Sequence, residues 1–317
     1  MNGKIYYLFP GQGAQYPGMA LDFLDCDEKI KQLFTLASGI VGKNMEDLLK
    51  NSSPDELKRT DISQPVITLA NLASAKYLEI KNPGINISGC AGFSLGEYAA
   101  LAIAGIISEE DCFYLVTERG KAMQKVIDDI EASGKDAPSM IAVMGLNPGQ
   151  VEDLLKDWEK EGVNDLYAAN FNSPRQVAIS GTALALDEAE KRFKEAGARR
   201  VVRLQVGAPF HSPLLKEAAD IFTPALEKIS FNDPGIPVFS NVTGRQIQSG
   251  KEAKALALRQ IVESVRWTDV EASIAQNDPS LLLETGPGKV LQGLWKDTGS
   301  EIPCLPAGTK MDIDQLP

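Results

Sequence analysis

The sequence predicts an α/β fold, and three observations lead to that prediction. Short apolar runs typical of buried strands alternate with stretches typical of helices along most of the 317 residues. A G-x-S-x-G pattern at 92–96 separates one such strand from a helix. Between about residues 139 and 205 the elements follow the order β-α-β-β-α-β. We therefore expect a hydrolase-like core with a mostly parallel sheet and a nucleophile elbow, plus an inserted ferredoxin-like small domain.

The expected domain boundaries follow from chain length and from one break in composition. A chain of 317 residues is long enough for a large α/β domain that carries an insertion. The stretch 132–138 is rich in small and polar residues, which is typical of a linker. We expect a large domain formed by 1–136 and 206–317, and a small domain formed by 137–205.

Composition argues against several classes of function. Hydrophobic residues make up 44% and charged residues 24% of the chain, as in ordinary globular proteins. The formal net charge of -11 argues against a general nucleic-acid binder. The four cysteines are scattered without metal-ligand spacing, which indicates reduced thiols and no metal site. No apolar run is long enough for a membrane span or a signal peptide, so we expect a cytoplasmic enzyme.

The elements around the G-x-S-x-G pattern fit a strand-to-helix turn. Residues 85–91 alternate as a short strand does, and 97–107 are rich in alanine and leucine, as in a helix. Such a turn exposes the hydroxyl of Ser94 at its apex, beside the free N–H groups of the first helical turn. A chance pattern in a structural turn is the alternative that the residues leave open.

A glycine-rich loop at 10–15 follows the first predicted strand, 4–9. It lacks the dinucleotide-binding spacing because Tyr16 stands where the third glycine is required, and no Walker lysine follows. The loop still presents backbone N–H groups and the Gln12 amide at the carboxyl end of a strand, where ligands bind in open α/β sheets. An ordinary turn is again the alternative.

The rest of the chain supplies the other elements of the two domains. In the large domain, helices are predicted at 21–38, 45–50, 66–81, from 108, 214–229, 251–262 and 290–296, and strands at 237–241 and 280–284. In the small domain, strands are predicted at 139–145, 167–172, 176–181 and 199–205, and helices at 148–162 and 182–196.

Two residues stand out for their chemistry. His211 is the only histidine, and it lies in a loop between Pro209 and Pro213, after a strand and before a helix. A hydrolase-like fold places its base in such a loop, although a lone histidine is more often a structural hydrogen-bonding residue. Arg119 lies in the middle of the helix that begins at 108, where an exposed salt bridge is the usual role of arginine.

Eight short motifs run in order over nearly the whole chain. They are F-P-G-Q-G-A-Q at 9–15, G-F-S-L-G-E at 92–97, E-R-G-K-A-M at 118–123, A-N-F-N-S-P-R-Q at 169–176, A-P-F-H-S-P-L at 208–214, S-N-V-T-G at 240–244, V-R-W at 265–267 and E-T-G-P-G-K-V-L at 284–291. No single motif is specific, but the ordered set resembles the malonyl-CoA:acyl-carrier-protein transacylases of fatty-acid synthesis and the acyltransferase domains of polyketide synthases.

This resemblance implies ping-pong transfer of a malonyl group from malonyl-CoA to the phosphopantetheine thiol of acyl carrier protein. It implies Ser94 as the nucleophile and His211 as the general base. It further implies an oxyanion hole formed by the backbone N–H groups of Gln12 and Leu95. The expected partners are malonyl-CoA and acyl carrier protein, with no permanently bound cofactor, no nucleic acid and no membrane.

The resemblance also assigns roles to two residues around this pair. Arg119 is expected to pair bidentately with the free malonyl carboxylate. Gln260 matches a family glutamine near the site, and in the family a backbone carbonyl, rather than an acid, usually orients the histidine. One departure is Phe93, which stands where the family usually has a histidine.

Two other functions stay open. A serine hydrolase or thioesterase would use the same dyad of Ser94 and His211 with water as the acceptor, and Arg119 together with the inserted domain counts against it. A non-catalytic carrier-protein-binding module is supported only by Phe93.

Carrier-protein docking on an acidic chain requires a local basic patch. The densest basic run includes Lys191 and Lys194 on a predicted helix of the small domain, and Arg175 in a nearby turn is expected to join them. The alternatives are a solvated face balanced by neighbouring glutamates, and docking on the rim of the large domain around the elbow.

Overall fold

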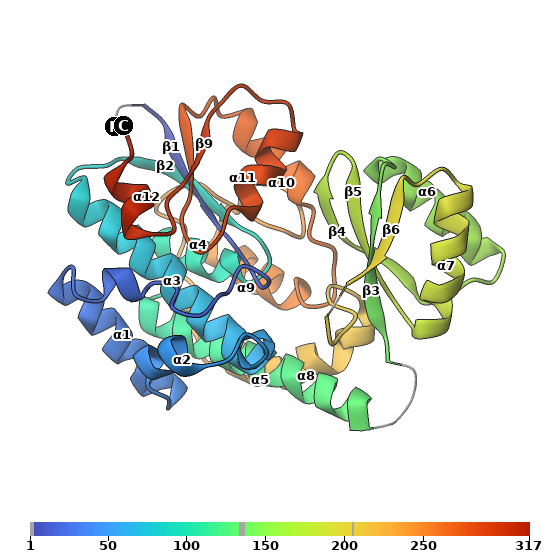
Figure 1. The fold of residues 1–317 in the computed structure, drawn as a ribbon, viewed down its shortest axis with the longest axis horizontal. Coiled ribbons are helices and arrows are strands. Elements are labelled where there is room, and N and C mark those ends of the chain that lie inside the picture. Colours follow the sequence, from blue (N-terminus) through green and yellow to red (C-terminus); the bar gives the residue numbers. More distant parts are fainter. Residues whose placement is uncertain (1–2, 133–136, 205) are drawn as a thin grey trace.

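The structure is a computed structural model that describes residues 3–132, 137–204 and 206–317. A large parallel sheet and a smaller antiparallel sheet stand side by side (Figure 1). The five strands of the large sheet have the order β7-β2-β1-β8-β9, and every neighbouring pair is parallel. They are β1 Ile5–Phe9, β2 Ile87–Gly92, β7 Val238–Phe239, β8 Leu281–Glu284 and β9 Cys304–Pro306. The expected mostly parallel sheet is confirmed.

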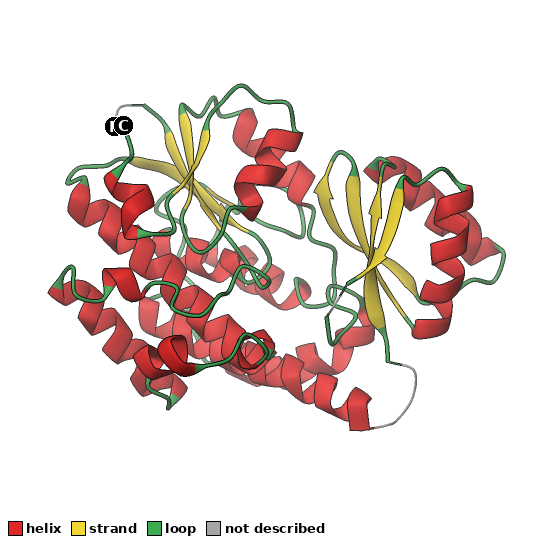
Figure 2. Cartoon of the chain, viewed as in Figure 1, coloured by secondary structure: helices red, strands yellow, loops and turns green. Residues whose placement is uncertain are grey.

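Strand β1 occupies the middle of this sheet, and all five of its residues are buried. Helices cover both faces of the sheet (Figure 2), which explains why β1 is continuously apolar rather than alternating. At its carboxyl end, Phe9 lies opposite Gly92 of β2. The loop after β1 and the turn after β2 therefore open at the same edge, where ligands bind in parallel sheets.

The helices of the large domain pack in layers around this sheet. They are α1 Glu28–Val41, α2 Met45–Asn51, α3 Thr60–Lys81, α4 Gly96–Ile103, α5 Glu109–Ala132, α8 Lys216–Glu227, α9 Gly250–Arg259, α10 Trp267–Ala275, α11 Val290–Asp297 and α12 Lys310–Asp314, with short 3₁₀ turns η1 Leu21–Phe23, η2 Glu56–Lys58 and η3 Pro213–Leu215. Helix α3 is buried over most of its length, as expected for a central packing helix.

Two predicted helices have other bounds in the structure, and three elements of the structure were not predicted. The helix expected at 21–38 is interrupted, because Asp27 is extended and its side chain accepts the N–H of Lys29, which makes it the N-cap of α1. Helix α3 begins at Thr60 rather than at 66, with Pro65 inside it. Strand β9 and helices α10 and α12 were not predicted. For β9 the reason is its length, since three residues carry no periodic signal.

The small domain has the predicted ferredoxin-like arrangement. Its elements are β3 Ser139–Met144, α6 Pro148–Lys160, β4 Leu166–Ser173, β5 Gln176–Gly181, α7 Ala183–Glu195 and β6 Arg200–Arg203. The strand order is β4-β5-β3-β6, and every neighbouring pair is antiparallel. Helices α6 and α7 cover the face of this sheet that points away from the large sheet (Figure 1). The opposite face of the small sheet is therefore turned towards the large domain.

We propose the division into 1–136 with 206–317 and 137–205 as the domain boundaries of the chain. The two hydrophobic clusters around the large sheet contain no residue of the small sheet, which supports the division. Both crossing points fall next to 133–136 and 205, which lie outside the described residues, and so does most of the linker expected at 132–138.

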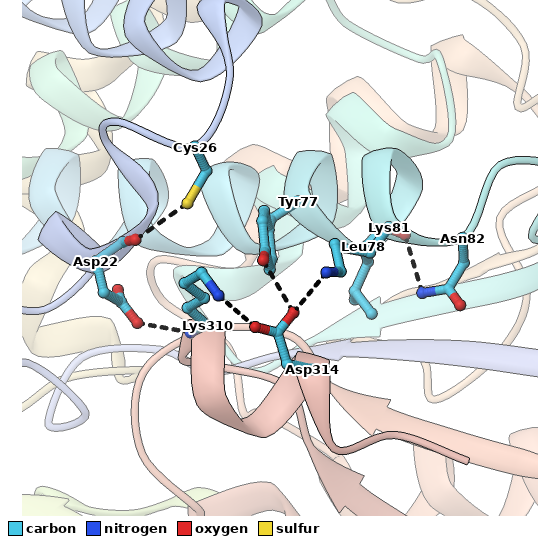
Figure 3. A network of polar contacts seen from close by, with 8 residues as sticks. All are labelled: Asp22, Cys26, Tyr77, Leu78, Lys81, Asn82, Lys310 and Asp314. Atoms are coloured by element: carbon cyan, nitrogen blue, oxygen red, sulfur yellow. Dashed lines mark hydrogen bonds and ion pairs between the residues drawn. The ribbon is translucent and has the colours of Figure 1, made fainter.

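A polar network fixes the last helix to the large domain (Figure 3). Asp314 of α12 accepts a hydrogen bond from Tyr77 at 2.9 Å and pairs with Lys81 at 3.0 Å, both on α3, and with Lys310 of α12 itself. These hydrogen bonds, with that from Lys310 the strongest, hold the pKa of Asp314 far below its usual value. The backbone N–H of Lys310 donates to Asp22 at 2.6 Å. The end of the chain is thus tied to residues near its beginning.

Candidate active site

The turn between β2 and α4 has the geometry of a nucleophile elbow. Ser94 has a φ of +48°, in the left-handed region that non-glycine residues rarely adopt. A Cβ on Gly92 would lie 2.0 Å from the backbone of Gly96, and one on Gly96 would lie 2.0 Å from the oxygen of Phe9. Only glycine allows the backbone to fold this closely on itself at either position. The interpretation of G-x-S-x-G as an ordinary turn is therefore disfavoured.

Asn241, which received no role from the sequence, holds this turn from the segment that follows the neighbouring strand β7. Its Oδ1 accepts the N–H of Ser94 at 2.6 Å, and its Nδ2 donates to the oxygen of Gly92 at 2.7 Å. The side chain is fully buried. A left-handed non-glycine residue costs about 1–3 kcal/mol and persists where its surroundings over-determine it. The sequence signal that could have indicated a role for Asn241 is its position directly after β7, the strand that pairs with the elbow strand β2.

Ser94 and His211 form a hydrogen-bonded pair. The distance from Ser94 Oγ to His211 Nε2 is 2.8 Å, and His211 Nδ1 lies 2.7 Å from the backbone oxygen of Gln260. Since a carbonyl oxygen can only accept, Nδ1 carries the proton and Nε2 is free to accept the serine proton. No carboxylate is needed to orient the ring. The structure therefore brings together Ser94, His211 and Gln260, the last of which only the family resemblance connects with the site.

The surroundings of His211 keep it neutral. Burial, and secondarily the positive charge of Arg119, lower the pKa of His211 from 6.5 to about 4. A neutral imidazole is the form that can take a proton from serine. At neutral pH nearly all of the protein therefore has a neutral His211 that can accept a proton.

Arg119 is buried rather than exposed, with 1% of its surface accessible. Its Nη2 donates to Gln260 Oε1 at 3.1 Å and lies 3.5 Å from Ser94 Oγ, while its Nε has no partner. No carboxylate forms an ion pair with it among the described residues. Burial lowers the pKa of Arg119 below its usual value. A desolvated cation with an unused donor beside the nucleophile is suited to an anionic group of a ligand.

The loop after β1 lies against the elbow, as its edge position predicts. Gly11 touches it closely, because a Cβ there would lie 2.3 Å from the oxygen of Phe93 and 3.6 Å from the nitrogen of Leu95. The N–H groups of Gln12 and Leu95 donate no hydrogen bond to any part of the chain that the structure describes. Two unused donors beside a nucleophile fit an oxyanion hole, and we propose that role for both.

Ser94, His211 and Arg119 line a cleft of about 660 Å³ between the two sheets. Gln12, Ser94 and Arg119 contribute from the large domain, and Asn172 and Gln176 from the small domain. A cleft of this size accommodates an extended small molecule that reaches the serine from solvent. The inserted domain therefore forms one wall of the site.

The predicted docking residues are not gathered at this cleft. Lys191 and Lys194 are exposed on α7, which lies on the far face of the small sheet (Figure 1). Arg175 is exposed beside Gln176, which does line the cleft. Docking of a carrier protein on α7 and docking around the cleft both stay predictions.

The side chain of Phe93 packs against a hydrophobic cluster beside the elbow. Its ring lies 5.4 Å from that of Trp267, in a cluster of apolar residues under α10 and α11, on the face of the large sheet that is turned towards the small domain. An aromatic ring at this position thus contributes packing beside the elbow without entering the hydrogen bonds of the serine–histidine pair.

Within 3–132, 137–204 and 206–317, no group of three or more potential metal ligands comes together. None of the helices in those ranges is long and apolar enough to cross a membrane.

The neutral state of His211 gives a direct prediction. In NMR spectra of the untagged protein, the single histidine ring should titrate with a midpoint near pH 4, because burial and Arg119 disfavour the charged form. Arg119→Leu should raise this midpoint, since it removes the nearby positive charge. A midpoint near the ordinary 6.5 in the folded protein would contradict the described site.

Comparisons with known proteins agree with this geometry. A family model described as acyl transferase domain matches residues 6–313. The chain is 37% identical over 293 residues to the malonyl CoA-acyl carrier protein transacylase of Haemophilus influenzae, covering 92% of this chain and 91% of that protein. It is similar to the solved structure of the corresponding transacylase from Clostridium perfringens, with a TM-score of 0.90 and 33% identity over 98% of this chain and 95% of that chain.

A third comparison concerns a complex. The chain is similar to a malonyl-transacylase solved together with its type II PKS acyl-carrier protein, with a TM-score of 0.89 and 33% identity over 98% of each chain. The match therefore extends over both sheets, including the inserted domain. The chain belongs to the acyltransferase family that includes the malonyl CoA-acyl carrier protein transacylases.

Proposed function

We propose that the chain is a malonyl-CoA:acyl carrier protein S-malonyltransferase of fatty-acid synthesis. The observation that carries the proposal is the buried Arg119, whose Nη2 lies 3.5 Å from Ser94 Oγ and which has no carboxylate partner in the described structure. Such a cation accommodates an acyl group that itself ends in a carboxylate. Relatives named malonyl CoA-acyl carrier protein transacylase support the same assignment.

In the first half-reaction, Ser94 Oγ attacks the thioester carbonyl of malonyl-CoA while His211 Nε2 takes its proton. The negative charge that develops on the carbonyl oxygen is stabilised by the N–H groups of Gln12 and Leu95. The tetrahedral intermediate collapses with cleavage of the carbon–sulfur bond. The proton on His211 goes to the departing sulfur, so CoA leaves as a thiol and malonyl remains as an ester on Ser94.

The second half-reaction reverses these steps with a different thiol. His211 Nε2 accepts the proton of the phosphopantetheine thiol of acyl carrier protein, and the thiolate attacks the malonyl ester. The same two N–H groups stabilise the second oxyanion. Cleavage of the ester bond returns the proton to Ser94 and releases malonyl-acyl carrier protein.

Selectivity follows from the charge of Arg119. A malonyl carboxylate can pair with the guanidinium through two parallel hydrogen bonds, whereas an acetyl group would leave the buried cation without a partner. Burial makes this difference large, because an unpaired charge is costly in a site of low dielectric. We therefore propose Arg119 as the residue that distinguishes malonyl from neutral acyl groups.

Other features of the proposal follow from the same residues. Ser94 and His211 supply the nucleophile and the base, so we propose that no permanently bound cofactor takes part. The four cysteines form no disulfide, which supports the proposed cytoplasmic location. A hydrolase with the same dyad is the competing function, and the acceptor in the experiment below distinguishes the two.

Incubation with malonyl-CoA should increase the intact mass of the protein by one malonyl group, and Ser94→Ala should abolish that increase. Because Ser94 is at a turn apex, the variant should keep the fold and thermal stability of the wild type. Addition of holo-acyl carrier protein should remove the group and transfer it to the carrier. Rapid loss of the adduct to water alone would establish the hydrolase instead, and labelling of the Ser94→Ala variant would refute the nucleophile.

Arg119→Ala should lower kcat/KM for malonyl-CoA at least about a hundredfold, because a buried charge pair with the substrate is lost. Activity on acetyl-CoA should fall much less or rise, since the unpaired cation is removed with the side chain. Lys121→Ala, two residues along the same helix and exposed, is the matched control and should leave both rates unchanged. An equal loss of kcat/KM for malonyl-CoA and acetyl-CoA would mean that Arg119 supports the fold and does not bind the malonyl carboxylate.

A further inference from the structure

We propose that Glu97 is a positioning residue that fixes, through two neighbours, all three reactive groups of the site: the Ser94 turn, the His211 ring and the Arg119 guanidinium. The inference deepens the proposed function, because its kinetic consequences are measured on malonyl transfer. Glu97 does not touch Ser94 Oγ or the histidine ring in the described structure, so its effect is exerted through other residues.

Glu97 lies in the first turn of the helix that follows the elbow and is 1% exposed. Its Oε2 accepts two hydrogen bonds, from the backbone N–H of Asn241 at 2.9 Å and from Gln260 Nε2 at 2.9 Å. These two residues come from separate segments, one after β7 and the other after α9. A single carboxylate oxygen therefore joins three segments that meet behind the nucleophile.

The Glu97 carboxylate helps to fix the orientation of the Gln260 side-chain amide. Gln260 Nε2 donates to Glu97 and also to the oxygen of Ser94 at 3.0 Å, and both partners can only accept. Its Oε1 must then face the opposite side, where it accepts from Arg119 Nη2 at 3.1 Å. The backbone oxygen of the same residue accepts the Nδ1 proton of His211. Holding Gln260 in place thus orients both the base and the anion-binding cation.

Glu97 also holds Asn241, the residue that fixes the conformation of the elbow turn. It fixes the backbone of Asn241, and the Asn241 side chain bonds Ser94 N and Gly92 O. Ser94 keeps its left-handed conformation because these hydrogen bonds are in place. The nucleophile and the base are therefore positioned by hydrogen bonds that converge on one oxygen.

Glu97 is also the buried negative charge closest in this network to Arg119, from which it is separated by the Gln260 amide. The charged and titratable groups that face it are Arg119 from α5, Tyr98 beside it on α4, and His211 beyond Gln260. Burial raises the pKa of Glu97 to about 7, although hydrogen bonds from Asn241 and Gln260 and the charge of Arg119 oppose the shift. Protonation of Glu97 would weaken both hydrogen bonds that it accepts.

The kinetic test compares Glu97→Gln with a matched variant, Glu284→Gln. Glu284 is also fully buried and accepts two N–H donors, those of Leu291 and Gln292, but it contacts none of the groups above. Acylation by malonyl-pantetheine, a thioester without phosphate, should fall at least about tenfold in Glu97→Gln and within about threefold in Glu284→Gln. The preference for malonyl over acetyl should also fall in Glu97→Gln alone, because Arg119 loses its fixed partner.

The pH profile gives a readout that loss of stability would not produce. In the wild type, acylation by malonyl-pantetheine should decline as the pH falls through about 7, where Glu97 takes up a proton, well above the decline expected from His211 near 4. The amide in Glu97→Gln does not titrate, so the decline near 7 should disappear. A Glu97→Gln variant with wild-type acylation, unchanged preference and an unchanged profile would overturn the proposal.

A substrate-free measurement separates this inference from the proposed function. The Nδ1 proton of His211 should exchange slowly with water in the wild type and in Glu284→Gln, and at least about tenfold faster in Glu97→Gln. Slow exchange in all three proteins would refute the positioning role even if malonyl transfer is confirmed. Absence of any malonyl-enzyme, combined with the expected exchange pattern, would instead refute the transfer function and leave the positioning role standing.

Discussion

Ser94 has a left-handed backbone, and the rest of the site depends on that constraint. Its φ of +48° is compatible with the fold only because Gly92 and Gly96 permit close backbone contacts and the Asn241 side chain bonds both sides of the turn. The conformation directs the hydroxyl to His211 and leaves the next N–H, that of Leu95, unused. One local geometry at the end of a parallel strand thus positions the nucleophile and one proposed oxyanion donor, and it directs the hydroxyl to a base from a distant segment.

The second physical feature is a buried positive charge that forms no ion pair with a carboxylate in the described structure. Arg119 lies on a helix packed against the core, and its guanidinium donates to Gln260 and Ser94 and lies 5.5 Å from the centre of the Tyr98 ring, all of them uncharged groups. Leaving a guanidinium desolvated lowers stability, so its retention indicates use by a ligand. The same charge helps to keep His211 neutral. In the proposed function, one residue therefore selects for an anionic acyl group and also helps to keep the histidine in the neutral form that accepts a proton.

The sequence predicted the parts of the site that are encoded locally. The glycine spacing around Ser94, and the loop position of His211, follow from short-range rules about turns and strand ends. Arg119 looked exposed from helical spacing alone, and only the motif resemblance indicated its role, because burial depends on the packing of distant segments. Asn241 and Glu97 received no role, since their contacts join residues 147 and 163 positions apart. The docking role of Lys191, Lys194 and Arg175 stays a prediction, because charge density alone does not reveal which face of a sheet a helix covers.

The most direct test is a crystal structure of the malonyl-enzyme, formed with malonyl-CoA in the absence of an acceptor thiol. The account predicts an ester on Ser94 whose carboxylate lies within about 3 Å of the Arg119 guanidinium. It also predicts an ester carbonyl oxygen at a similar distance from the N–H groups of Gln12 and Leu95. A malonyl group on another residue, or a carboxylate that points into solvent while Arg119 still bonds only Gln260, would contradict it.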